Sequence, residues 1–435
     1  MATQISGAGG TTTSFSNAPQ AQDDLVTVTA SGVPLTEDLT GVLKLNVLAN
    51  DSGGAAKTLW SVDDASGSTG TSTNGNTYPT DLLTKDVTYT TDTAGLAGTS
   101  DTSSMGAKIW IGSDGYVHYD TSGIAAQLQA LGAGEYFTDT FTYAIKLGNG
   151  TLSWATATVR IGGTNDAPDI HLVTSDSAAA SLNETNAPLT ASGTLTVTDP
   201  DLSDTVATTV DSVSLGGTKG GLTSADVLGM LSLSASSVAA DATDTHNLGW
   251  TFNSTPQAFD FLAAGETLTL TYTIKANDGH GGTDTQTVTI TIHGTNDAPV
   301  AVADTNAGLE DSTITGSVAT NDSDVDDGAV LTYAQVGSVA GLTINPDGSY
   351  SFDASNAAYQ HLAEGATLPV VASYTVTDEH GASASSTLTI TLTGTNDAPV
   401  AVADTNAGLE DSTITGSVAT NDSDVDDGAV LTYAQ

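Results

Sequence analysis

Much of the chain alternates hydrophobic and polar residues with a period of two. Within 268–274 every second residue is Leu, Tyr or Ile, within 288–292 it is Val or Ile, and Thr fills the positions between. Successive side chains of a β-strand point to opposite faces, so this pattern predicts half-buried antiparallel strands. No segment shows a helical period.

Short segments rich in Gly, Asp, Asn and Pro separate these runs. They lie at 112–115, 277–282, 345–348 and 378–381. Such residues favour turns, so each segment predicts a hairpin. Closely spaced turns between alternating runs predict an all-β protein of immunoglobulin-like β-sandwich modules in a linear array.

Internal repetition divides the chain. The sequence Gly-Thr-Asn-Asp-Ala-Pro occurs at 163–168, 294–299 and 394–399, and 294–335 recurs unchanged as 394–435. We therefore expect three modules joined by three linkers, with the last copy cut short. The expected ranges are 1–20 for a polar lead, 21–162 for the first module (an N-terminal cap), 163–168 for a linker, 169–293 for the second module, 294–299 for a linker, 300–393 for the third module, 394–399 for a linker, and 400–435 for a truncated copy of the third module.

Charge narrows the possible partners. The 435 residues include 43 Asp and eight Glu against eight Lys and Arg, giving a net charge of −43. Such an excess of anions argues against nucleic acid. Asp is also a turn former and a ligand of hard cations, so Ca²⁺ is the expected cofactor.

Other composition features exclude several classes. The absence of Cys excludes disulfides and thiolate metal sites. No apolar run is long enough to span a membrane, and 1–20 lacks the basic and apolar regions of a Sec signal peptide. The seven His lie at no metal-protease spacing, so we expect no catalytic residues and no enzyme.

The acidic residues can be sorted by the end of the sandwich at which they lie, because successive antiparallel strands place their loops alternately at the two ends. Each linker should then meet acids from the modules on both sides, and their oxygens suit calcium, which takes about six to eight oxygen ligands. For the first joint, between the first and second modules, the expected ligands are Glu37, Glu135, Asn165, Asp166, Asp199, Asp201 and Asp278. For the second joint they are Glu184, Glu266, Asn296, Asp297, Asp322, Asp324, Asp326 and Asp378, and at the third joint Glu310 and Glu364 face Asn396 and Asp397.

A structural alternative stands beside each of these assignments. Asn, Asp and Gly are also the residues that β-turns need, and Asp347 in Asn-Pro-Asp-Gly is sufficiently explained as a turn. Trp60, Trp110, Trp154 and Trp250 suit a hydrophobic core better than a sugar-binding face.

Together the repeated motifs resemble the VCBS and tandem cadherin-like repeats of large bacterial surface adhesins of the RTX type. The resemblance covers nearly all of 17–435 and is carried by the Asn-Asp-Ala-Pro linkers, by Asn-Asp-Ser-Asp-Val-Asp-Asp at 321–327 and by Asp-Glu-His-Gly at 378–381. By this resemblance the second module is VCBS-like and the third is cadherin-like. It implies calcium between the modules, type I secretion and an extracellular or cell-surface location. Gly294 and Ala298 replace an Asp and an Asn of the animal cadherin linker, so fewer ions per joint are expected.

These observations favour a calcium-stiffened structural and adhesive extender of a bacterial cell-surface or secreted protein, supporting cell adhesion or biofilm attachment. Expected partners are cell-surface or abiotic surfaces, including glycans. Two alternatives remain: glycan or surface binding by the first two modules, and a non-catalytic appendage of a secreted hydrolase. The first module should end the calcium-bound array, because Asn17 and 50–54 replace acids that the other modules carry.

Overall fold

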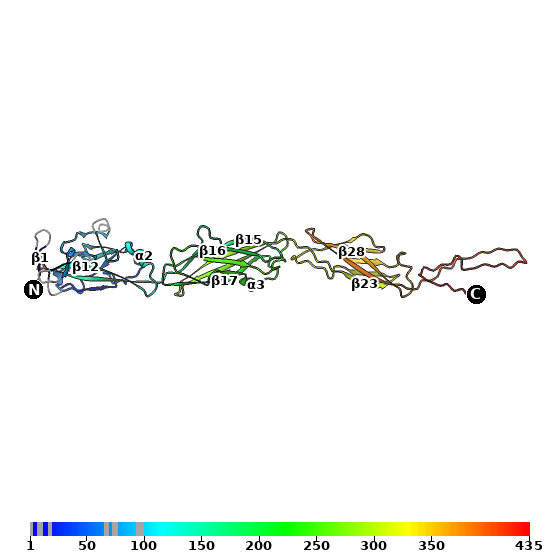
Figure 1. The fold of residues 1–435 in the computed structure, drawn as a ribbon, viewed down its shortest axis with the longest axis horizontal. Helices are drawn as coiled ribbons and strands as arrows, with labels where there is room; N and C mark the ends of the chain where they lie inside the picture. Colours follow the sequence, from blue (N-terminus) through cyan, green and yellow to red (C-terminus); the bar gives the residue numbers. More distant parts are fainter. Residues whose placement is uncertain (1–2, 7–11, 16–19, 65–68, 72–76, 93–99) are drawn as a thin grey trace.

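The computed structural model describes residues 3–6, 12–15, 20–64, 69–71, 77–92 and 100–435. Three β-sandwiches follow one another along the long axis of the molecule, and 400–435 extends from the last of them (Figure 1). The all-β, tandem sandwich architecture predicted from the alternating pattern is confirmed. Within the described residues, no helix is long and apolar enough to cross a bilayer.

The first module packs two sheets, β1-β2-β13-β12-β5 with β3 beside β13, and β4-β11-β10-β8 with β9 beside β10. Tyr119, Phe141 and Tyr143 are fully buried between them. The strands are β1 (Thr3–Ser6), β2 (Thr12–Phe15), β3 (Asp24–Val26), β4 (Val42–Leu45), β5 (Thr58–Asp63), β8 (Thr88–Tyr89), β9 (Asp101–Thr102), β10 (Lys108–Gly112), β11 (Val117–Asp120), β12 (Tyr136–Lys146) and β13 (Leu152–Gly162). A small hairpin, β6 (Thr69–Thr71) and β7 (Thr77–Pro79), and short helices η1 (Gly54–Ala56), η2 (Asp81–Leu83), η3 (Thr121–Ile124) and α2 (Ala125–Leu128) complete it.

The second module packs the sheet β14-β16-β20-β18 against β15-β22-β21-β17-β19. Its core contains Trp250, Phe252 and Tyr272, and the alternating segments before residue 294 form a long antiparallel hairpin. The elements are β14 (Asp169–His171), β15 (Ala179–Asn183), β16 (Thr190–Thr198), β17 (Thr205–Gly217), α3 (Ser224–Val227), η4 (Leu228–Met230), β18 (Leu231–Leu233), β19 (Ser237–Ala239), β20 (Leu248–Asn253), β21 (Thr267–Asn277) and β22 (Thr283–His293).

The third module packs β23-β29-β28-β25 against β24-β27-β26 around Phe352 and Tyr374. Its strands are β23 (Asp304–Leu309), β24 (Thr313–Ser317), β25 (Thr332–Val336), β26 (Leu342–Ile344), β27 (Ser349–Asp353), β28 (Thr367–Thr377) and β29 (Ser383–Thr393).

The segment 400–435 has the same sequence as 300–335 but none of its strands. The first copy supplies β23, β24 and the start of β25, which pair with β29, β27 and β28. The second copy retains the bridge between Val400 and Ser423, and nearly all of its side chains are exposed. A strand of this type needs cross-strand partners to form, and 400–435 contains no counterparts of β27, β28 and β29.

Candidate metal centres at the joints

A glutamate from the preceding module is fixed against the start of each linker. β15 and β23 run parallel to the last strand of their module, so the residue after each, Glu184 or Glu310, lies beside the first linker residues. The linker Thr donates to the Glu at its joint. At the first joint, Thr164 donates from both its backbone N–H and its hydroxyl to Glu37 Oε1, each at 2.6 Å. The pairing recurs between Thr295 and Glu184 and between Thr395 and Glu310.

The linker Asn and Asp are fixed against the following module. Asn165 Nδ2 donates to Asp278 Oδ2 at 2.9 Å, and Asp166 N–H donates to Asp201 Oδ2 at 2.9 Å. The second joint repeats both contacts with Asn296 to Asp378 at 2.9 Å and Asp297 to Asp326 at 3.1 Å. The third joint retains the contact from Asp397 to Asp426 at 3.0 Å.

The linker glycines fit under a carbonyl of the preceding module. A Cβ on Gly294 would collide with the carbonyl oxygens of Leu262 and Ala263, and one on Gly163 would collide with those of Leu131 and Gly132. Only glycine therefore allows the linker to pass this close to the end of the sandwich.

Carboxylates from the linker and both flanking modules converge at the joints. In each of four groups, one ligand atom per residue lies within 4.8 Å of the others. The groups are Glu37, Asp166 and Asp201; Asp199, Asp204 and Asp278; Glu184, Asp260 and Asp297; and Glu310, Asp397 and Asp426.

Many oxygens at these joints are buried without a hydrogen-bond donor among the described residues. A buried carboxylate oxygen without a partner is costly, so each of them favours a cation. They are Glu37 Oε2, Asn165 Oδ1, Asp199 Oδ2, Asp201 Oδ1, Asp260 Oδ1, Asn296 Oδ1, Asp297 Oδ2, Glu310 Oε2, Asp324 Oδ2, Asp326 Oδ1, Asp397 Oδ2 and Asp426 Oδ1.

Two kinds of carboxylate occur within a joint. Burial, and then repulsion from neighbouring carboxylates, raises the pKa of Asp201 and of Asp326 to about 6. Burial also acts on Asp278 and Asp378, but hydrogen bonds from the linker Asn and from backbone N–H groups of their own hairpin outweigh it and lower the pKa of each. Hydrogen bonds thus stabilise the ionised form of Asp278 and Asp378, whereas burial and repulsion disfavour the ionised form of Asp201 and Asp326.

Seven of the predicted carboxylate ligands lie outside these four groups. Three of them, Asp324, Asp326 and Asp378, still lie at the second joint, where Asp326 and Asp378 accept from the linker. The other four are Asp322, Glu135, Glu266 and Glu364. Asp322 Oδ1 instead accepts from Val302 N–H at 2.7 Å and lies near Tyr374 Oη, so it anchors the start of the module. Glu135 and Glu266 accept from backbone N–H groups of their own turns, at 3.1 Å and 3.3 Å, and Glu364 is exposed.

Sequence reasoning did not assign Asp260 and Asp204 to a joint. Asp260 lies on the turn before β21, six residues ahead of the Glu266 that was chosen, and alternation gives no information about turns. Asp204 follows Asp201 by three residues and its Oδ2 accepts from His280 Nδ1 at 3.0 Å. The Asp-rich segment 199–204 was the available signal for the second of these.

Lys57 lies close to 50–54, the loop of the first module that lacks the acids of the other modules. Asp51 repeats the anchoring role of Asp322, since its Oδ1 accepts from Gln22 N–H at 2.7 Å and from Tyr143 Oη–H at 3.1 Å. Beyond it, Lys57 Nζ donates to the carbonyls of Leu48 and Asp51, each at 2.5 Å. Asn17 lies outside the described residues, so the predicted end of the array stays a prediction.

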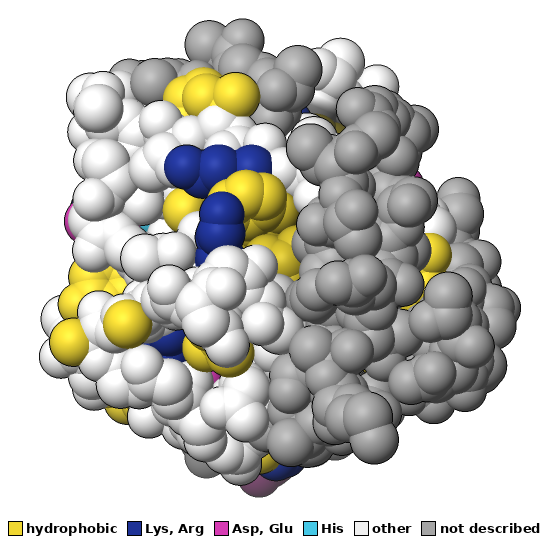
Figure 2. All heavy atoms as spheres, turned by 90° about the vertical axis from the view of Figure 1, so that its left-hand side faces the viewer, with side chains coloured by type: hydrophobic (Ala, Val, Ile, Leu, Met, Phe, Trp, Pro, Cys, Tyr) yellow, Lys and Arg dark blue, Asp and Glu magenta, His cyan; other side chains and the backbone are white. Residues whose placement is uncertain are grey.

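Positive side chains gather at this N-terminal end. Figure 2 shows Lys and Arg around hydrophobic side chains on the part that is not drawn grey. Lys146 Nζ lies 4.3 Å and Lys85 Nζ 5.9 Å from the centroid of the Trp60 ring. The end thus differs in charge from the acidic joints.

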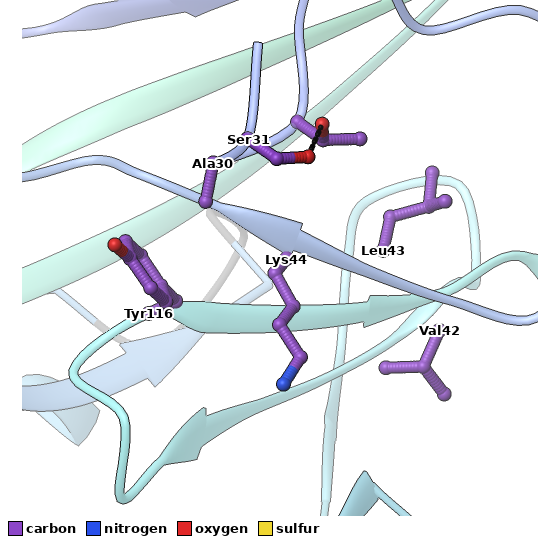
Figure 3. A pocket seen from close by; sticks show the side chains of 7 residues that line it. Ala30, Ser31, Val42, Leu43, Lys44 and Tyr116 are labelled. Carbon is purple, nitrogen blue, oxygen red and sulfur yellow. Dashed lines mark hydrogen bonds between the residues drawn. The ribbon is translucent and has the colours of Figure 1, made fainter. Parts of the chain in front are cut away.

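A shallow hollow on the side of the first module, seen in Figure 3, has different chemistry from the joints. It is lined by Thr29, Ala30, Ser31, Val42, Leu43, Lys44 and Tyr116. Its charged group, Lys44 Nζ, donates to Asp114 at 2.9 Å. The hollow therefore offers an apolar surface beside one paired ammonium group.

Comparison with known proteins identifies the type of the third module. Residues 296–394 match the family of bacterial cadherin-like domains. Among solved structures, domains 3–6 of protocadherin gamma B7 share 14% identity over 88% of this chain and 76% of that chain, with a TM-score of 0.40. Domains 22–24 of mouse cadherin-23 share 13% over 87% and 96%, with a TM-score of 0.35. No curated protein matches the sequence.

The third module is thus cadherin-like. The VCBS character of the second module and membership of a bacterial RTX-type adhesin stay predictions from the sequence.

Proposed function

We propose that the chain is an extracellular, non-catalytic extender whose joints are stiffened by calcium and which supports adhesion of a bacterial cell-surface or secreted protein. The observation that carries the proposal is the convergence of buried, unpartnered carboxylate oxygens at the linkers. Within each module the hydrophobic core is complete without an ion, so the cation would act between modules.

The donor set fits calcium better than magnesium. The linker Asn Oδ1 atoms and carboxylates from three separate loops offer many oxygens in irregular geometry, which calcium accepts with about six to eight ligands. Magnesium demands near-ideal octahedral geometry and keeps several waters. At the first joint Glu37, Asp166 and Asp201 would hold one ion, and Asp199, Asp204 and Asp278 would surround a second position.

Three of the four tryptophans favour an extender over a glycan-binding module, whereas Trp154 on β13 is 36% exposed, so the prediction that it belongs to the core was wrong. Trp110 and Trp250 are 2% and 1% exposed, so they belong to the cores. Trp60 is partly buried beneath lysines. Trp110 and Trp250 therefore offer no stacking surface for a glycan.

Small-angle scattering with and without calcium tests the proposal. With calcium, the pair-distance distribution should be that of a rod, and after chelation its maximum dimension and profile should change to those of a jointed chain. Sodium chloride at about 0.15 M screens exposed charges beyond about 8 Å but should not restore the rod, because a monovalent ion cannot bridge several carboxylates. Identical profiles under all three conditions would refute calcium stiffening.

A further inference from the structure

The few basic residues of the chain are concentrated in the first module. Six of the eight Lys and Arg lie there, although most of the acids lie outside it. Lys44, Lys57 and Arg160 are engaged by a carboxylate, by two backbone carbonyls and by a tyrosine ring, respectively. Lys85 and Lys146 differ from these, because both lie over the ring of one tryptophan.

The ring of Trp60 is a fixed platform for these two side chains. Trp60 belongs to a small hydrophobic cluster with Tyr78, Leu83 and Leu152, which is separate from the main core of the module. Its Nε1–H donates to the carbonyl of Leu83 at 3.3 Å. The two Nζ atoms lie 4.3 Å and 5.9 Å from the centroid of the ring, so cation–π attraction confines both ammonium groups to the surroundings of one side chain.

This platform lies at the end of the first module that points away from the first joint. Lys146 is the last residue of β12, and the first residue of that strand, Tyr136, pairs with Gly162 at the start of the linker. Lys85 is exposed and Lys146 is partly exposed. On the part of this end that is not drawn grey, Figure 2 shows basic side chains beside hydrophobic ones. We call the surface formed by Trp60, Lys85 and Lys146 the basic end.

Neither ammonium group of the basic end is balanced by a carboxylate. All Asp and Glu of the chain fall within the described ranges, and none of them forms an ion pair with Lys85 or Lys146 there. Asp86, the neighbour of Lys85 in the sequence, is engaged by β5, since its carboxylate accepts from Val62 N–H at 2.7 Å and from Ser61 Oγ–H at 3.3 Å. The basic end thus carries two unpaired positive charges in a chain whose net charge is −43.

Two ammonium groups over an aromatic ring suit an anionic ligand better than a neutral sugar, because the lysines lie where a sugar would stack. The acids at the joints do not prevent such binding, since at physiological ionic strength charges are screened beyond about 8 Å. We propose that the basic end binds an acidic polysaccharide, whose carboxylates contact the ammonium groups of Lys85 and Lys146. This deepens the adhesive function proposed above, on which it rests, by naming the class of surface component that the first module contacts.

The number of charges favours a polysaccharide over two other anionic partners. An anionic membrane is recognised by clusters of about four to eight Lys and Arg, whereas the basic end has two. In a second copy of this chain, many acids are held at the joints by the linker and the neighbouring module. A uronic acid polymer carries one free carboxylate on each sugar, so neighbouring sugars supply the two anions that the basic end requires.

Binding of the full chain to immobilised polygalacturonate, measured by biolayer interferometry, tests the proposal. The measurement is made in chelator, because calcium bridges between the polymer and the acidic loops would otherwise mimic binding. Methyl-esterified polygalacturonate is the uncharged control polymer. The decisive variant carries Lys85→Gln and Lys146→Gln. Its matched control carries Lys108→Gln and Lys219→Gln, which remove the same charge from exposed positions outside the basic end, and circular dichroism checks the fold of both variants.

The unsubstituted chain should bind polygalacturonate but not its methyl ester, and binding should weaken as sodium chloride is added. The double variant at the basic end should bind about 30-fold more weakly, from about 1 kcal/mol for each lysine near an anionic surface. The control variant should bind like the unsubstituted chain. Equal binding by the two double variants, or no binding to the polymer at low salt, would overturn the proposal.

Two further measurements identify the other partners. Binding to phosphatidylglycerol vesicles without binding to the polymer would overturn the polysaccharide in favour of a membrane surface. Self-association in sedimentation that is lost only in the variant of the basic end, again without polymer binding, would overturn it in favour of a second copy. Calcium stiffening is measured separately by scattering. Failure of polymer binding therefore leaves the calcium-stiffened joints intact, and identical scattering profiles would refute stiffening without changing the result for the polymer.

Discussion

Substitution of Asp297 by Ala should change the stability of the second joint in opposite directions with and without calcium. Without divalent ions, the Asp297 carboxylate lies among Glu184 and Asp260, with ligand atoms within 4.8 Å. Two unit charges at that distance repel by about 0.9 kcal/mol in water and about 3.5 kcal/mol at an effective dielectric constant of 20. Asp297 is partly exposed, so the lower value applies to each pair, and removal should stabilise the calcium-free protein by about 1–2 kcal/mol.

With calcium the sign should reverse. An ion bound with a Kd of about 10⁻⁴ M stabilises the folded joint by about 2.7 kcal/mol at a hundredfold excess over Kd. Asp297→Ala removes a central ligand and should lose most of this contribution. The variant should therefore melt higher than the unsubstituted chain in chelator and lower at about 10 mM calcium.

Differential scanning calorimetry of the full chain measures both conditions. Asp347→Asn serves as the control, since it removes a carboxylate from an exposed turn, and it should show no calcium-dependent difference from the unsubstituted chain. A shift of the same sign in chelator and in calcium would refute the view that Asp297 is a repulsive group that an ion converts into a ligand.

Three further predictions concern other parts of the molecule. In chelator, the free energy of unfolding should fall as pH rises from about 4 to 6. Asp201 and Asp326 have folded-state pKa values of about 6, above those of the unfolded chain, so the folded protein loses in this interval the protons that stabilise it. Melting temperatures measured across this pH range would check the prediction. Lys57→Met should destabilise the first module by about 2 kcal/mol both with and without calcium, since it leaves two carbonyls without their ammonium donor, and a loss seen in chelator but absent in calcium would contradict a calcium-independent role. Amide exchange should be much faster in 400–435 than in 300–335. Peptides from the two copies have the same sequence and mass, so their isotope envelopes in mass spectrometry should be bimodal. A single slowly exchanging envelope would show instead that both copies are equally structured.

The features predicted best from the sequence are the positions of side chains that strand direction and the linker motif determine. Sorting the loops by the end of the sandwich brought Glu37, Glu184 and Glu310 to their linkers, because parallel pairing with the last strand fixes the following residue at that end. It could not separate Asp322 from Asp324 and Asp326, which belong to one acidic run. Only the folded core shows that Tyr374 and Val302 N–H hold Asp322 away from the joint.

Asp260 could not be assigned to a joint from the sequence, for a different reason. It lies on an irregular turn between β20 and β21, where neither the strand period nor a repeated motif determines the direction of a side chain. The corresponding residues are Gln129 and Gln360, so comparison of the repeats within the sequence would have marked the position as variable but not as a ligand.

The recurring linker sequence does more than separate the modules. Its Gly passes under carbonyls that leave no room for a Cβ, and its Thr donates to a Glu of the preceding module. Its Asn side chain and its Asp backbone N–H donate to acids of the following module. These hydrogen bonds bring carboxylates from three loops together, but each uses only some of their oxygens and leaves others without a donor. In the function proposed above, a cation balances the repulsion that remains, which would explain how a chain with so few basic residues forms closely packed joints.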